Sequence, residues 1–269
     1  MPELPEVETV VNGIRSHVTN KTIQSVWTSG FRLRCSNQDD LSEQLIDTCI
    51  TGVSRRAKYI AIHLDTHIDT VIHLGMSGKL MIEGPDYQVK KHDHVTLTLS
   101  DNSKLVFNDA RRFGMFFWHD DIHQYLKHYG VEPLSDAFNS VYLSLVCQNK
   151  QIAIKQLIMD QKYVVGVGNI YACEALFKSN VLPNRPANTV TEAELSLLVL
   201  SIKKTLTTAI EEGGTTLKDY RTANNTLGYF QQRLAVYGRE GEPCYVCGSW
   251  VQNKKMGQRS TFYCNECQR

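Results

Sequence analysis

The stretch CYVCGSWVQNKKMGQRSTFYCNEC (residues 244–267) decides how the end of this chain folds. It holds two Cys-x2-Cys pairs with 16 residues between them, and these four thiols are half of the eight cysteines in the chain. Each pair turns two thiolates toward one point, and two such pairs complete a tetrahedral site at zinc-ribbon spacing. We therefore predict a hairpin that holds one structural zinc ion (Zn2+) between Cys244, Cys247, Cys264 and Cys267. The alternative is a pair of disulfides or four buried thiols, and the spacing favours zinc.

Length and composition describe an ordinary globular protein. A chain of 269 residues suggests about two domains, and 42% hydrophobic with 21% charged residues is typical of soluble proteins. There is no apolar run long enough for a membrane span, and the N-terminus MPELPEVETV has neither the basic nor the apolar region of a signal peptide. Unpaired cysteines beside a thiolate metal site are typical of a reducing compartment, so we expect a cytoplasmic protein with no membrane partner.

Charge alone does not decide whether the chain binds nucleic acid. The net charge is only +1, but a binding face can be basic while the whole protein is nearly neutral. Basic residues gather at four places, each of which could equally be a solvated face: Arg55 to Lys58, Lys90 to His92, Arg111 with Arg112, and Lys254 to Arg259.

The first half of the chain predicts one helix followed by antiparallel strands. Apolar residues from Val7 to Val18 recur at helical spacing, so residues 3–18 are expected to form an amphipathic helix. The period then changes to two, and Gly, Asn and Asp punctuate the pattern. The expected strand regions are 21–34, 50–64, 69–83, 94–100, 104–109 and 114–118. Many short strands with one leading helix favour a β-sandwich.

The pattern becomes helical after Gly130-Val131-Glu132-Pro133. One long helix carries apolar residues from Leu195 to Ile210 and ends at Gly213-Gly214. The turn GVGNIY (166–171) leads into another helix; it lacks the third glycine of a dinucleotide fingerprint, although the N–H groups of such a helix start suit a phosphate. The fold class is therefore α+β.

The first residues permit two interpretations. Pro2, Glu3, Pro5 and Glu6 suit the start of a helix, where proline loses no hydrogen bond and acids face the positive end of the dipole. Alternatively, removal of Met1 would expose the secondary amine of Pro2, whose pKa near ~8 leaves a nucleophilic fraction at neutral pH. Attack of this amine on a sugar C1′ would give an iminium, and the adjacent Glu3 could supply a proton during ring opening.

Motifs along the whole chain resemble those of formamidopyrimidine-DNA glycosylases. In order, they are MPELPEVET (1–9), RRAKYI (55–60), HLGMSGKL (73–80), KHDH (91–94), RRFG (111–114), VGVGNIYACEALF (165–177), GGTTLKDY (213–220) and the cysteine hairpin. The resemblance implies an N-terminal β-sandwich with a leading helix, a helical helix–two-turn–helix domain and a C-terminal zinc finger. We place the β-sandwich at residues 1–131, a linker at 132–142, the helix–two-turn–helix domain with its lesion-recognition loop at 143–235, and the zinc finger at 236–269.

The resemblance also implies an activity. Such enzymes serve base-excision repair in the bacterial nucleoid: they remove oxidised purines (8-oxoguanine and formamidopyrimidines) from duplex DNA, preferably opposite cytosine, and then cut the abasic strand by β,δ-elimination. A monomer fits this task. By position, Pro2 matches the Schiff-base nucleophile, Glu3 the general acid and Glu6 a supporting carboxylate. Lys58 and Arg259 match the groups assigned to β- and δ-elimination and to phosphate binding. Because a guanidinium stays charged, we expect Arg259 chiefly to clamp a phosphate.

The resemblance assigns DNA contacts to further residues. Met76, Arg111 and Phe113 match a trio that fills the space left by an everted base, although Met76 and Phe113 could also be core residues. The expected phosphate contacts are His92, Lys150, Asn169 and Tyr171, with a helix cap as the plain role of Asn169. The loop over the everted purine would include Thr216, Leu217, Lys218, Asp219 and Tyr220.

Two departures and two alternatives accompany this interpretation. Ala110 stands where many relatives have proline, and residues 221–227 differ from the family pattern, which bears on the base preference. One alternative is a sister enzyme of the endonuclease VIII type, which excises oxidised pyrimidines. The other is a zinc-ribbon DNA-binding protein without catalysis.

Overall fold

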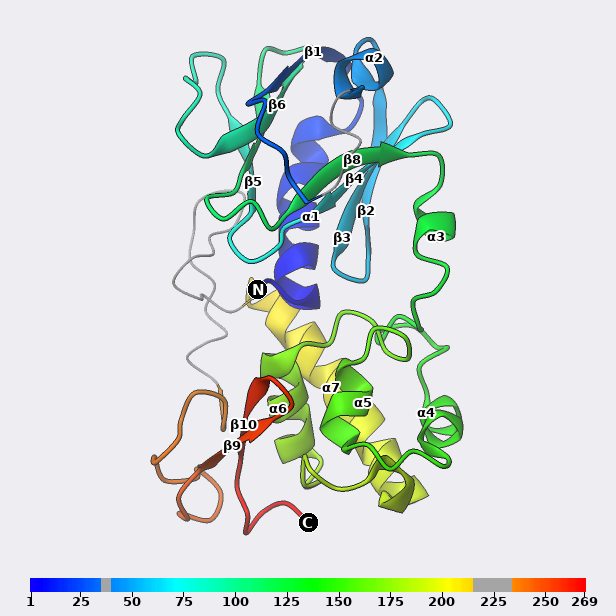
Figure 1. The fold of residues 1–269 in the computed structure, drawn as a ribbon, viewed down its shortest axis with the longest axis vertical. Helices are drawn as coiled ribbons and strands as arrows, with labels where there is room; N and C mark the ends of the chain where they lie inside the picture. Colours follow the sequence, from blue (N-terminus) through cyan, green and yellow to red (C-terminus); the bar gives the residue numbers. More distant parts are fainter. Residues whose placement is uncertain (35–39, 215–233) are drawn as a thin grey trace. The chain divides into compact units, whose positions relative to one another are not determined.

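The computed structural model describes residues 1–34, 40–214 and 234–269, which form two compact units (Figure 1). Unit 1 consists of Met1–Lys127 with Gly213 and Gly214, and unit 2 consists of His128–Glu212 with the described residues from Leu234 to Arg269.

Unit 1 begins with helix α1 (Leu4–Val18), which confirms the predicted leading helix. Its N-cap is Glu3, Pro5 lies in the first turn, and Glu6 stands at the third helical position of a capping box. The apolar residues of the helical repeat are buried, including Val7, Val11 and Ile14. The helix therefore packs by its apolar face, as an amphipathic pattern requires.

Unit 1 continues with two four-stranded antiparallel sheets. The first has the order β1 (Ile23–Thr28), β6 (Asp93–Leu99), β7 (Lys104–Asn108) and β5 (Lys79–Glu83). The second has the order β2 (Ile50–Arg56), β3 (Tyr59–Leu64), β4 (Asp69–His73) and β8 (Met115–His119). Short helices α2 (Leu41–Leu45) and α3 (Ile122–Tyr125) accompany them.

One apolar core joins α1 to both sheets. Side chains of the helix, of β6 and of β3 belong to the same buried cluster, and α1 contacts β2 and β3 of one sheet and β5 of the other. Val95, Leu97 and Leu99 of β6 are fully buried, and its polar residues Asp93, His94 and Thr96 are buried as well, so both faces of this strand are covered. The β-sandwich with a leading helix is therefore the architecture of unit 1.

The structure divides two regions that the sequence pattern left continuous. Residues 50–64 form the hairpin β2–β3, whose turn is Ala57-Lys58 with Ala57 in the left-handed region (φ 55°). Residues 69–83 separate into β4 and β5, which lie in different sheets.

Unit 2 is helical and ends in a two-stranded hairpin. Its helices are α4 (Ser140–Cys147), α5 (Ile154–Met159), α6 (Asn169–Lys178), the 3-10 turn η1 (Ala187–Thr189) and α7 (Glu192–Glu211). The hairpin pairs β9 (Gln252–Met256) with β10 (Arg259–Tyr263). Cys173 and Phe177 of α6 pack with Val236, Val251 and Cys264, so α6 and the hairpin share a small core.

Over the described part of the chain, no helix is both long and apolar enough to cross a membrane.

Candidate active site and metal centre

The head of α1 is buried together with its acidic groups. Pro2, Glu3 and Glu6 are all buried, and Glu6 Oε2 accepts a hydrogen bond from the Glu3 backbone N–H at 2.8 Å. Gly214 lies against Glu6: a Cβ on Gly214 would stand 3.1 Å from Glu6 Oε1, and its φ is +80°. Glycine therefore permits both the close approach and the left-handed backbone at this point.

An ion pair brings the β2–β3 turn beside α1. Arg55 Nε donates to Glu8 Oε2 at 2.6 Å, and Arg55 Nη1 donates to the carbonyl of Ala57 at 3.0 Å. The next residue is Lys58, which is 8% exposed despite its place in a hairpin turn. One guanidinium thus fixes the Lys58 turn against the second turn of α1.

His73 belongs to the same region and was not assigned a role from the sequence. Burial, and then the positive charges of Lys58 and Arg34, lower the pKa of His73 from 6.5 to about 4. Its Nδ1 accepts the Gly75 N–H at 3.0 Å, and its ring lies 4.8 Å from that of Tyr59. A neutral imidazole beside two cations can accept a proton when an anion such as a phosphate arrives. The only sequence feature that could have drawn attention to His73 is its place as the first residue of the motif HLGMSGKL.

Two loops of unit 1 present the residues expected to plug the duplex. Met76 is 39% and Phe113 is 47% exposed, so neither is a core residue. Arg111 is exposed, and its Cζ lies 4.9 Å from the centroid of the Phe113 ring. A Cβ on Gly75 would fall 2.5 Å from backbone atoms of Phe113 and Gly114, so only glycine lets the two loops come this close.

Buried Asp109 connects these loops. Its Oδ1 accepts from the Ser77 hydroxyl at 2.5 Å and from the Arg111 N–H at 3.2 Å, and its Oδ2 accepts from the Gly114 N–H at 2.8 Å. The half-buried His92 is held to the same residue through its carbonyl, which accepts the Asp109 N–H. The hydrogen bonds of Asp109 therefore hold together the two loops that carry Met76, Arg111 and Phe113.

In unit 2, a buried lysine joins α5, α6 and the hairpin. Lys155 is 1% exposed, and its Nζ donates to Asn169 Oδ1 at 2.6 Å, to Thr261 Oγ1 at 2.7 Å and to the Ser260 carbonyl at 3.1 Å. The Asn169 amide donates to the same Ser260 carbonyl. Exposed Arg259 precedes Ser260, so the network brings the arginine of the hairpin and Asn169 into one neighbourhood.

Two further predicted contacts differ in character. Lys150 is half-buried, and its Nζ lies 5.6 Å from the centroid of the Tyr163 ring. Tyr171 is 1% exposed, so its ring is a core group. The five residues Thr216, Leu217, Lys218, Asp219 and Tyr220 lie outside the described residues.

The four hairpin cysteines could hold a metal ion. Their Sγ atoms all lie within 4.8 Å of one another, with 3.8 Å between Cys244 and Cys267 and 3.4 Å between Cys247 and Cys264. A tetrahedral ion with metal–sulfur bonds of about 2.3 Å has sulfur–sulfur edges of about 3.8 Å. Hydrogen bonds from Ser249 lower the pKa of Cys247 to about 6, whereas burial raises the pKa of Cys264 and Cys267, so the charge of a bound cation would be needed to hold all four as thiolates. The donor set fits a closed structural site.

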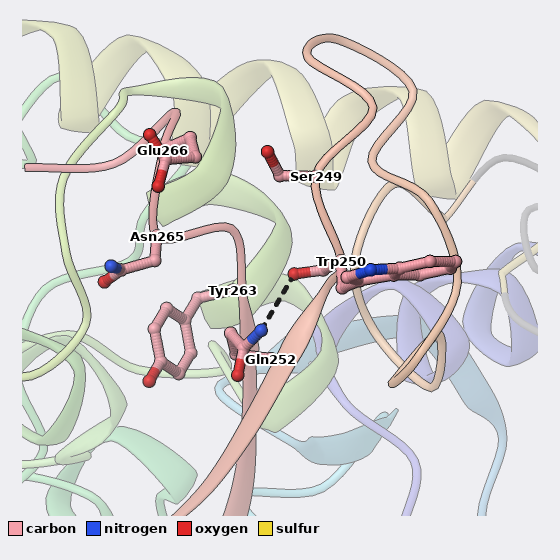
Figure 2. Close-up of a pocket in the computed structure, with 6 residues that line it drawn as sticks. All are labelled: Ser249, Trp250, Gln252, Tyr263, Asn265 and Glu266. Atoms are coloured by element: carbon pink, nitrogen blue, oxygen red, sulfur yellow. Dashed lines mark hydrogen bonds between the residues drawn. The ribbon is translucent and has the colours of Figure 1, made fainter.

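A pocket lies on the same hairpin, next to the cysteine cluster. It is lined by side chains from both arms, namely Ser249, Trp250, Gln252, Tyr263, Asn265 and Glu266. Figure 2 shows the hydrogen bond from the Gln252 amide to the Trp250 carbonyl, at 3.1 Å. Among the described residues that line it, none is a predicted catalytic group, so the pocket is not a candidate active site.

Comparison with known proteins defines the class. Residues 1–116 match the formamidopyrimidine-DNA glycosylase N-terminal domain, and residues 129–221 match the formamidopyrimidine-DNA glycosylase H2TH domain. Proteins named formamidopyrimidine-DNA glycosylase from Vibrio parahaemolyticus and Photorhabdus laumondii are 50% and 48% identical over 270 residues, with full coverage of both chains.

Solved structures of similar proteins point to the same family. A Lactococcus lactis FPG mutant in complex with Fapy-dG containing DNA has a TM-score of 0.93 at 32% identity, with full coverage of both chains. The MutM (FPG) protein of Thermus thermophilus has a TM-score of 0.86 at 35% identity, covering 99% of this chain and 98% of that one. The fold and site thus define a DNA glycosylase with a helix–two-turn–helix domain. The chain belongs to the formamidopyrimidine-DNA glycosylase family and is an enzyme of DNA base-excision repair.

The lowered pKa of His73 predicts a pH dependence of stability. The folded protein resists protonating His73 until about pH 4, whereas the unfolded chain protonates it near 6.5. The free energy of unfolding should therefore fall as the pH is lowered from 6.5 toward 4, because the unfolded state binds the extra proton. His73→Asn keeps an acceptor for the Gly75 N–H and should lose less stability over this range, measured by urea unfolding at pH 7 and pH 5. His17→Asn, at an exposed position of α1, is the control. An equal acid loss in His73→Asn and the wild type would contradict the assignment.

Proposed function

We propose that this enzyme removes oxidised purines from duplex DNA through a Schiff base on Pro2 and then cuts the abasic strand by β,δ-elimination. The observation that supports this most strongly is the buried head of α1, where Pro2 and Glu3 adjoin and Glu6 holds the Glu3 backbone. Relatives of known structure were captured with Fapy-dG containing DNA and with DNA containing an abasic site.

The chemistry follows from a secondary amine. After Met1 is removed, the lone pair of the Pro2 nitrogen forms a bond to C1′ as the C1′–base bond breaks with its electron pair on the base. The proton that the nitrogen loses neutralises the departing base. Protonation of O4′ by Glu3 opens the sugar, and the nitrogen and C1′ become an iminium. The iminium acidifies C2′–H, and loss of that proton expels the 3′ phosphate. A second proton loss, at C4′, expels the 5′ phosphate. Water then releases the enzyme.

The cations bind the phosphates on which this depends. Lys58 is held beside α1 by Arg55, and His73 lies close enough for Lys58 to lower its pKa. We assign phosphate contacts to Lys58, His92, Lys150 and Arg259, and backbone contacts to the first turn of α6 with Asn169 and Tyr171. Such contacts position the duplex without reading its sequence.

The exposed plug residues fit an enzyme that everts its target. Met76, Arg111 and Phe113 combine a flexible thioether, a hydrogen-bonding cation and a flat ring, which suits filling the space left by a flipped nucleotide. In this proposal Arg111 contacts the orphaned base and favours cytosine. The protein acts as a monomer in the bacterial cytoplasm, and its four thiolates hold one Zn2+.

Reductive trapping tests the proposal. Borohydride reduction during reaction with an 8-oxoguanine:cytosine duplex should yield a covalent protein–DNA complex, because only an amine nucleophile gives a reducible iminium. Peptide mapping should place the crosslink on a Pro2 that has lost Met1. No adduct would favour a non-catalytic DNA binder, and an adduct on another side chain would refute the proposed nucleophile.

The structure of one relative points to oxidised pyrimidines as a second class of substrate. A complex of the wild-type Lactococcus lactis FPG contains DNA with an oxidised pyrimidine. Competition between 8-oxoguanine and thymine-glycol duplexes decides the question: we expect 8-oxoguanine to be excised in preference, and the reverse order would favour an endonuclease VIII-type range.

Replacing Glu3 should separate the two activities. Glu3→Gln removes the acid but keeps a side chain of the same shape at the head of α1. We expect base excision from an 8-oxoguanine duplex to fall by about 100-fold or more, as for loss of a general acid, with much less effect on a preformed abasic site. Gel assays on the two substrates measure this, and equal losses would contradict the role of Glu3.

Replacing one metal ligand should unfold the hairpin. Cys247→Ala should lose the bound zinc, measured by atomic absorption, and should also lose affinity for DNA because the metal-binding energy is folding energy. Cys49→Ala is the matched control, since that thiol lies outside the cluster. A zinc-free Cys247→Ala protein with normal DNA binding would contradict the structural role.

A further inference from the structure

Phe31 is an aromatic side chain that the proposed mechanism leaves unused. The residue follows β1 in the chain and is 58% exposed. A single exposed apolar residue is common on protein surfaces and has no meaning by itself. The surroundings of Phe31 are what distinguish it.

Phe31 forms a pair with Arg112, one residue from the plug. The Arg112 Cζ lies 5.3 Å from the centroid of the Phe31 ring, much as Arg111 lies over Phe113 at 4.9 Å. Arg112 adopts a left-handed backbone with φ 55°, a strained conformation for an arginine that recurs in functional loops. The loop of residues 111–113 therefore takes part in two arginine–aromatic pairs, one with its own Phe113 and one with Phe31 of the neighbouring loop.

Hydrogen bonds hold the Phe31 loop against the plug loop. The Arg34 N–H donates to the Gly114 carbonyl at 3.2 Å, and the Ser29 N–H donates to the His94 carbonyl at 3.0 Å. Buried His94 lies between the loops, with Nδ1 2.9 Å from the Ser29 hydroxyl and Nε2 2.9 Å from the Asp109 carbonyl. The ring centroids of His94 and Phe31 lie 6.3 Å apart, with the two rings nearly perpendicular. The Phe31 ring is thus already positioned before any ligand arrives.

The charge of this rim identifies its partner. Four exposed arginines lie on these two loops, namely Arg32, Arg34, Arg111 and Arg112, whereas Asp109 of the plug loop is fully buried. Guanidinium groups interleaved with exposed rings suit a nucleic acid, because phosphates pair with arginine and nucleotides stack on aromatic faces.

We propose that Phe31 and Arg112 form a second DNA contact beside the plug, in which the Phe31 ring packs on a nucleotide and Arg112 binds a phosphate. This inference rests on the proposed function, since the duplex is then the enzyme's substrate. The pair adds a contact that is indifferent to sequence and lies next to the site of distortion, which supports the duplex where the everted base weakens stacking.

Salt dependence separates the two members of the pair. The probe is a duplex with a tetrahydrofuran abasic analogue, which has no C1′ leaving group, and binding is measured by fluorescence anisotropy from 50 to 300 mM salt. Phe31→Ala should weaken binding about tenfold at every salt concentration, because stacking releases no counterions. Phe31→Tyr should restore binding to within about twofold. Arg112→Gln should instead reduce the slope of log Kd against log salt by about 0.9.

Controls keep the outcomes distinct. Trp27→Ala removes another exposed ring, on β1, and should bind as the wild type does. Wild-type affinity in Phe31→Ala, or a weakening that Phe31→Tyr does not restore, would overturn the inference. Reductive trapping of the wild type is run in parallel: trapping without an effect of Phe31→Ala refutes this contact alone, whereas failed trapping refutes the proposed function itself.

Discussion

The arrangement of unit 1 depends on one guanidinium. Arg55 joins Glu8 of α1 to the carbonyl of Ala57, and the side chains of Arg55 and Glu8 are only 8% and 23% exposed. A partly buried pair is costly to break from one side, because the remaining charge is left without its partner. Glu8 lies five residues after Glu3, about 7.5 Å along the helix axis. The pair thereby sets the distance between the head of α1 and the Lys58 turn, on which the proposed chemistry depends.

Buried charged groups play the same role elsewhere. Asp109 braces the plug loops, Lys155 ties Asn169 to the hairpin, and Glu174 is fully buried and accepts the backbone N–H groups of residues 235–237. Each charge has several hydrogen-bond partners, as its burial requires. Apolar residues of similar volume could stabilise the fold as well. Apolar residues cannot form the directional hydrogen bonds that fix a loop in one orientation. We therefore infer that these buried charged residues serve to position the loops that they hold.

The sequence predicted what depends on local pattern and missed what depends on distant partners. Cys-x2-Cys spacing predicted the cluster, and the helical repeat of Val7 to Val18 predicted α1. The turn at Ala57 was missed because it uses a left-handed alanine where glycine or asparagine is the usual signal. The burial of Lys155 was not predicted, because two of its three acceptors, Ser260 and Thr261, lie more than a hundred residues away in the hairpin. His73 was quoted within a motif, but its lowered pKa arises from burial and then from the positive charges of Lys58 and Arg34, which the motif does not contain.

The start of α1 also shows why a helix start and a nucleophile can share the same residues. On the proposed mechanism, the amine of Pro2 must be uncharged to attack, and both the positive end of the helix dipole and burial disfavour its protonated form. A nearby carboxylate would oppose this by favouring the cation. Glu6, however, accepts the Glu3 backbone N–H, so part of its negative charge is directed into the helix cap. The capping residues thus favour the helix, and on the proposed mechanism the same residues would carry the reactive amine at its head, so the helix-start and nucleophile interpretations are compatible.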